Sequence, residues 1–84
     1  MITIKYFARL SEALNVKSEE VEFSEASNTV ENLIQSLVGR GEPWITEFSI
    51  ENKVLVAVNH ELSDRHATLE QGDEVAFFPP VTGG

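Results

Sequence analysis

The 84-residue sequence is long enough for one small domain with a modest core. Its 42% hydrophobic and 24% charged residues are typical of a globular chain, and the lack of cysteine excludes disulfides, a thiolate nucleophile and sulfur-based zinc sites. A net charge of −8 disfavours nucleic acid and anionic lipid and favours partner proteins with basic surfaces. Without a leader pattern or an apolar run of ~20 residues, the chain is expected to be cytoplasmic and to contact no membrane.

The first quarter of the chain predicts a β-hairpin. Residues 2–9 alternate in polarity, which is typical of a half-buried strand. One face of this strand carries Ile2, Ile4, Tyr6 and Ala8. A short helical turn is expected over residues 10–14, and residues 20–23 predict a second strand with Val21 and Phe23 on one side. We expect the two strands to pair.

The clearest helix begins after Asn28. Apolar residues recur there at helical spacing: Val30, Leu33, Ile34, Leu37 and Val38. Glu31 stands where the acid of a capping box would reach back to the helix start. Gly39 and Gly41 suit the helix end because glycine accepts the left-handed conformation, and Pro43 bars simple continuation.

The remainder of the chain predicts further strands. Residues 44–50 are ambiguous and compatible with a short helix, whereas the apolar β-branched run 54–58 predicts a strand that leads into a tight turn at residues 59–60. Residues 71–73 have turn chemistry, and residues 74–78 predict a final strand. This order, with one long helix, indicates an α+β protein of the β-grasp (ubiquitin-like) type, a mixed sheet packed on one main helix with its first and last strands adjacent.

The internal side chains form no recognisable catalytic site. His60 and His66 lie in polar, turn-like surroundings without a nucleophile beside them. The acids of the second strand region do not have calcium-loop spacing and are expected mainly on its wet face: Glu19, Glu20, Glu22 and Glu25. No metal site is therefore expected.

The C-terminal segment is the remaining candidate. Two prolines stop the last strand and favour an extended path, and the uncharged end finishes in Gly83 and Gly84, which lack a Cβ and can pass through a narrow channel. Activation of the Gly84 carboxylate as an adenylate, followed by displacement with a sulfur nucleophile, would give a thiocarboxylate and make the chain a recyclable carrier. An inert, frayed end is the alternative. We therefore divide the chain into a domain over residues 1–79 and a flexible tail over residues 80–84.

The ending, Phe-Phe-Pro-Pro-Val-Thr-Gly-Gly at residues 77–84, resembles that of the small subunit of molybdopterin synthase. Residues 71–76, the first strand, the helix from Thr29 and the run at residues 56–59 also fit this family. The resemblance covers the whole chain, and its specificity lies mostly in the last dozen residues.

The resemblance implies that an adenylating enzyme related to ubiquitin-activating enzymes uses ATP and magnesium to activate Gly84, so that this chain itself binds no cofactor. The tail would thread into the large catalytic subunit through Pro80, Val81, Thr82 and Gly83. There it would donate sulfur to a cyclic pyranopterin phosphate, with two transfers for each pterin. The chain would thus be the non-catalytic donor in a heterotetramer of two small and two large subunits.

Strand alternation also predicts a docking surface. If the apolar face of the first strand meets the helix, Phe7 points away from it, and Phe78 does the same on the last strand. With Leu62 as a third member, these residues are expected to form an outer apolar patch for the partner, bordered by acidic side chains.

Three other functions remain open. A sulfur carrier of thiamine biosynthesis also ends in Gly-Gly, but it is usually shorter and lacks the Phe-Pro-Pro approach. A ubiquitin-like modifier would join Gly84 to a lysine of another protein by an isopeptide bond. A plain interaction domain would have no use for a slender, uncharged end. The fold alone does not separate these functions.

Overall fold

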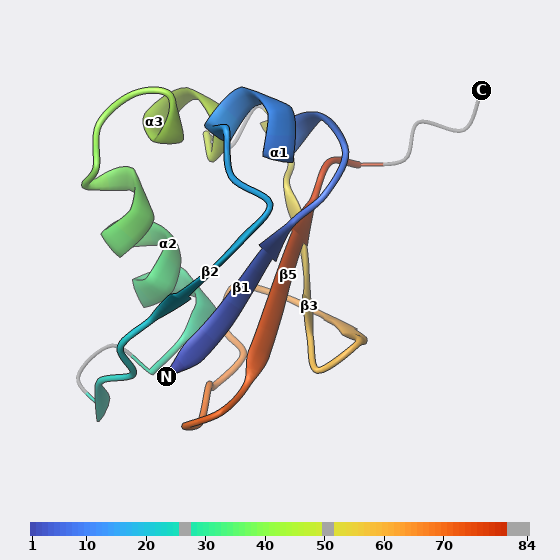
Figure 1. The fold of residues 1–84 in the computed structure, drawn as a ribbon. Helices are drawn as coiled ribbons and strands as arrows, with labels where there is room; N and C mark the ends of the chain where they lie inside the picture. Colours follow the sequence, from blue (N-terminus) through green and yellow to red (C-terminus); the bar gives the residue numbers. More distant parts are fainter. Residues whose placement is uncertain (26–27, 50–51, 81–84) are drawn as a thin grey trace.

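A five-stranded mixed sheet forms the body of the protein (Figure 1). The computed structural model describes residues 1–25, 28–49 and 52–80. In chain order the elements are β1 (Ile2–Tyr6), α1 (Arg9–Leu14), β2 (Ser18–Val21), α2 (Val30–Val38), α3 (Trp44–Glu47), β3 (Leu55–Val58), β4 (Glu61–Ser63) and β5 (Glu74–Phe78). The strand order is β2-β1-β5-β3-β4, in which only β1 and β5 run parallel. The predicted α+β β-grasp architecture, with the first and last strands adjacent, is confirmed.

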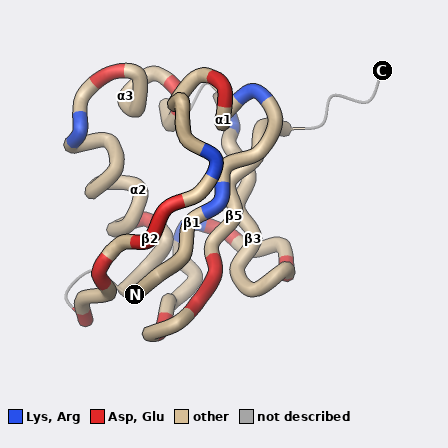
Figure 2. The backbone as a smooth tube through the Cα atoms, viewed as in Figure 1, with Lys and Arg blue, Asp and Glu red and all other residues tan. Residues whose placement is uncertain are grey.

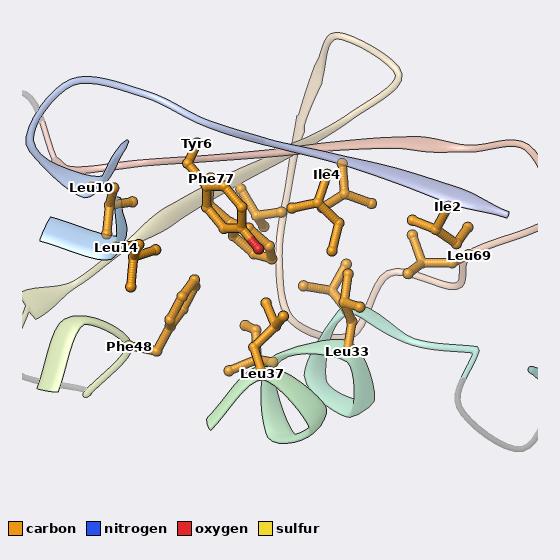
Figure 3. Packing of buried hydrophobic residues seen from close by; sticks show 14 residues of the cluster. Ile2, Ile4, Tyr6, Leu10, Leu14, Leu33, Leu37, Phe48, Leu69 and Phe77 are labelled. Atoms are coloured by element: carbon orange, nitrogen blue, oxygen red, sulfur yellow. The ribbon is translucent and has the colours of Figure 1, made fainter. Parts of the chain in front are cut away.

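The hydrophobic core lies between the sheet and α2. Alternate residues of the central strands and one stripe of the helix meet there (Figure 3). These buried residues include Ile2, Ile4, Tyr6, Val75 and Phe77 from the sheet and Val30, Leu33, Ile34 and Leu37 from the helix. In the described residues, no helix has the length and apolar character needed to cross a membrane.

The first hairpin forms as predicted, but its strands have different bounds. β1 ends at Tyr6, because Ala8 turns into a positive φ of 54° and is exposed where α1 begins. β2 covers Ser18–Val21 and not residues 20–23. Since Val21 already pairs with Ile2, the first residue of β1, Phe23 has no β1 residue left to face.

The start of α2 is stabilised by a threonine cap. The Thr29 hydroxyl oxygen accepts a hydrogen bond of 3.1 Å from the backbone N–H of Asn32. The predicted capping box is wrong, because the Glu31 carboxylate instead accepts bonds from Gln35 at 2.9 Å and Arg65 at 3.2 Å. The helix start is thereby tied to the loop that precedes β5.

The turns follow the glycine and asparagine positions. Gly39 caps α2 with an ordinary right-handed φ of −61°, so the predicted left-handed ending is wrong there, whereas Gly41 has a φ of 93°. The short helix expected after Pro43 is α3. Asn59 and His60 form the tight β3–β4 turn with φ of 50° and 70°, as hairpin turns of two residues require.

Candidate functional site

The root of the C-terminal segment is held rigidly at the sheet centre. β5 lies between β1 and β3, and its penultimate residue, Phe77, is completely buried. The Phe77 ring stacks on Tyr6 at 6.1 Å and meets Phe48 edge-on at 5.0 Å between ring centroids. Because β5 pairs with β1 on one side and β3 on the other, the strand ends at a well-defined point near α1 (Figure 1).

The structure reaches only the first of the predicted tail residues. Pro80 is described and is half-buried, two residues beyond the end of β5. The predicted threading residues Val81, Thr82 and Gly83 and the reactive Gly84 lie outside the described residues. Their roles and the division of the chain at residue 80 therefore stay predictions.

The outer face of the sheet carries an apolar patch next to this root. Phe7 is 48% exposed and Leu62 is 73% exposed, while Phe78 is half-buried. The backbone N–H of Phe7 donates to the carbonyl of Phe77 at 3.1 Å, which places Phe7 beside the end of β5. Phe7 is therefore a surface residue, as predicted.

The pairing of β3 with β4 and β5 adds three residues to this patch that were not predicted from the sequence. Leu55 pairs with Phe78, and Ala57 pairs with Ala76 on β5 and with Leu62 on β4. Leu55 is 36% exposed. Alternation within residues 54–58 would have identified two of these residues, because Val56 is buried and its neighbours Leu55 and Ala57 must face outward. The outer apolar patch thus consists of Phe7, Leu55, Ala57, Leu62, Ala76 and Phe78.

The charges around the outer apolar patch are mixed. At the start of β5, away from the tail root, the Glu74 carboxylate lies 3.6 Å from Lys5 Nζ and 3.5 Å from His60 Nε2. On the tail side, Arg9 follows Phe7 by two residues and Lys53 precedes Leu55 by two residues, and neither makes an ion pair with a described residue. The predicted acidic border is therefore only partial, since cations stand nearest the tail (Figure 2).

The histidines and acids of residues 1–25, 28–49 and 52–80 do not gather into a metal-binding group. Among these residues, no set of three His, Asp or Glu side chains could hold a metal ion. His60 and His66 are exposed. The described domain thus offers the end of β5 as a tail root and an apolar surface beside it.

Glu19 is the acid whose position differs most from the sequence prediction. It lies on the helix side of β2, where it accepts two bonds from Arg40 at 2.8 and 2.9 Å and one from the Tyr6 hydroxyl at 2.9 Å. The Arg40 bonds hold the pKa of Glu19 below its ordinary value, and burial raises the pKa of Tyr6. Arg40 also lies 4.5 Å from the centre of the Trp44 ring. This cluster fixes the end of α2 and the start of α3 against the sheet.

Comparison with known proteins assigns the family. A profile described as the ThiS family matches residues 4–84, nearly the whole chain. The chain belongs to the ThiS family. Among curated relatives in sequence, the molybdopterin synthase sulfur carrier subunit of Escherichia coli (strain K12) is 39% identical over 84 residues, which cover all of both chains.

Solved structures agree with the ThiS-family assignment. A putative molybdopterin converting factor, subunit 1, from Pyrococcus furiosus is 33% identical with a TM-score of 0.79, over 95% of this chain and 97% of that one. The small archaeal modifier protein 1 of H. volcanii is 28% identical with a TM-score of 0.75, over 95% of this chain and 97% of that one. The fold and the sulfur-carrier resemblance are both supported.

Proposed function

We propose that this protein is the sulfur carrier subunit of a molybdopterin synthase. The observation that carries the proposal is that the family match runs to residue 84 from a β-grasp body whose central strand ends at Phe78. Residues 79–84 can then span at most about 20 Å when fully extended. That reach suits delivery of a terminal group into an enclosed site of a partner.

The chemistry takes place at the Gly84 carboxylate. A partner enzyme with ATP and magnesium converts it into an acyl adenylate with release of pyrophosphate. A hydrosulfide equivalent then displaces AMP and leaves a thiocarboxylate, whose sulfur forms a bond to a carbon of a cyclic pyranopterin phosphate while a carbon–oxygen bond at that carbon breaks. Hydrolysis of the resulting acyl link returns the carboxylate, so that two loaded carriers supply the two sulfur atoms of the dithiolene.

The domain contributes docking and positioning to this reaction. The outer apolar patch binds the large subunit and, in a separate encounter, the adenylating enzyme. Both partners must dock beside the same tail root. Two carriers on two large subunits make the assembly. The pair of cations beside the root, Arg9 and Lys53, favours acidic groups at the entrance of the partner's site. We propose that all of these steps take place in the cytoplasm.

A protein modifier is the second candidate function. Similarity to the small archaeal modifier protein 1 of H. volcanii favours it, because a modifier and a sulfur carrier share activation as an adenylate. The two functions differ only in the acceptor of the activated glycine. The relative named as a synthase subunit, at higher identity over the full length, favours the carrier over both the modifier and a thiamine carrier.

The test is an intact-mass measurement of protein isolated together with its native activating enzyme. We expect one oxygen to be replaced by sulfur at Gly84, and a variant lacking Gly84 to remain unmodified as the matched control. Conjugates to lysines of other proteins without the thiocarboxylate would support the modifier and refute the carrier.

A further inference from the structure

Within the described residues, β2 has an unpaired edge, and β1 separates this strand from β5 and the tail root. It is the outermost strand next to β1 (Figure 1). Tyr6 N–H donates to the Lys17 carbonyl at 2.9 Å, so alternation directs the backbone groups of Glu19 and Val21 toward β1. The backbone groups of Ser18 and Glu20 point outward, and no other described element bonds to them. This edge can accept another strand.

A hollow of about 250 Å³ lies beside the edge, between β2 and α2. Val21 and Phe23 are on the helix side of β2 and only partly buried against the core. Five of the eight lining residues are apolar, namely Ile2, Val21, Phe23, Leu33 and Leu69, and the polar residues Glu22, Ser24 and Ser36 complete the lining. A strand added to β2 would direct every second side chain into this hollow.

The charge along the edge selects the occupant. Glu20 is exposed on the side of β2 opposite to Val21, Glu22 is exposed at the rim of the hollow just after the strand, and Glu25 follows; none of the three pairs with a described cation. Figure 2 shows this run of acids along β2 and the segment after it. Edge-to-edge pairing of two copies would bring the acids of both together, which disfavours a second copy of this chain. A basic segment would instead neutralise them.

We propose that the β2 edge and its hollow bind an extended segment of a partner protein in which apolar residues alternate with Lys or Arg. The apolar residues enter the hollow beside α2, and the basic residues lie next to Glu20 and Glu22. Because β1 separates β2 from β5, this site and the tail root can be occupied at the same time. The carrier could thus be held by one protein while it delivers its tail to another, a role beyond the proposed sulfur transfer.

The probe is a capped hexapeptide of alternating lysine and valine, titrated into the full chain and followed by amide NMR and hydrogen exchange. We expect saturable shifts along β2 and α2 and at least about tenfold slower exchange of the Ser18 and Glu20 amides. The double variant Glu20→Lys, Glu22→Lys should weaken binding at least about fivefold. These acids are exposed, so the variant should fold normally.

Two matched peptides separate strand addition from simple adsorption. A version with N-methyl groups on alternate residues keeps the charge and cannot pair along the edge, and a version with glutamate in place of lysine reverses the charge. Equal affinity for either one, failure of the original peptide to bind, or shifts confined to the outer apolar patch would overturn the proposal. Sulfur transfer measured with the peptide bound should be unchanged, so the outcome is independent of the proposed function.

Discussion

Replacing Phe7 with serine should weaken docking to the large subunit without unfolding the domain. Phe7 is 48% exposed, so binding of the partner can bury about half of the surface of this residue. A phenylalanine buries roughly 200 Å² when fully covered, so docking removes roughly 100 Å² more from water. At about 25 cal/mol per Å² this is worth about 2.5 kcal/mol. Kd is therefore expected to increase roughly 70-fold at 25 °C.

Titration calorimetry with the large subunit measures this loss, and circular dichroism checks the fold. The matched control is Ile45→Ser, because Ile45 is 47% exposed but lies on α3, which packs against α1 and α2 instead of the outer sheet face. We expect the control to bind like the wild type. Undiminished affinity of a folded Phe7→Ser protein, or an equal loss in the Ile45→Ser protein, would refute the assignment of the outer apolar patch.

Three further predictions follow from the tail root and the Glu19 cluster. One residue added after Gly84 should abolish sulfur transfer, assayed by product formation, while the melting temperature stays unchanged, because the last residue of the described core is Phe77. Gly83→Val should lower transfer at least about tenfold at unchanged stability if the tail threads a narrow channel, and normal turnover would exclude threading. Glu19→Gln should lose about 1 kcal/mol of unfolding free energy at pH 7. Because the folded pKa of Glu19 is depressed, its contribution is present above the ordinary value of 4.5 and disappears as the pH falls through the folded pKa. Urea unfolding at several pH values should therefore show the two proteins converging in acid, and a constant difference would contradict this.

Periodicity predicted the architecture well because the core is made by alternation and by one helical stripe. The β5 bounds and the buried side of β1 follow directly from that pattern. The limits of β1 and β2 could not be read in the same way, because they depend on pairing. The apolar Phe23 extends the β2 pattern past the point where Ile2 begins β1, and Ala8 extends the β1 pattern into a turn.

In the candidate site too, some features follow from the local sequence pattern and others depend on contacts between distant residues. The outward positions of Phe7 and Leu62 were predictable from alternation, but the membership of Leu55 required the register that sets it opposite Phe78. The inward position of Glu19 could not be predicted, because its partner Arg40 is 21 residues away in the sequence and a local pattern carries no information about such a pair.

The central claim is that sulfur leaves this chain from Gly84 and enters a pterin. The most direct test mixes thiocarboxylated protein with the large subunit and the cyclic pyranopterin phosphate in a single turnover and follows both species by mass spectrometry. The account predicts that two thiocarboxylates revert to carboxylates for each dithiolene formed. A thiocarboxylate that persists while the large subunit and the pterin are both bound would contradict it.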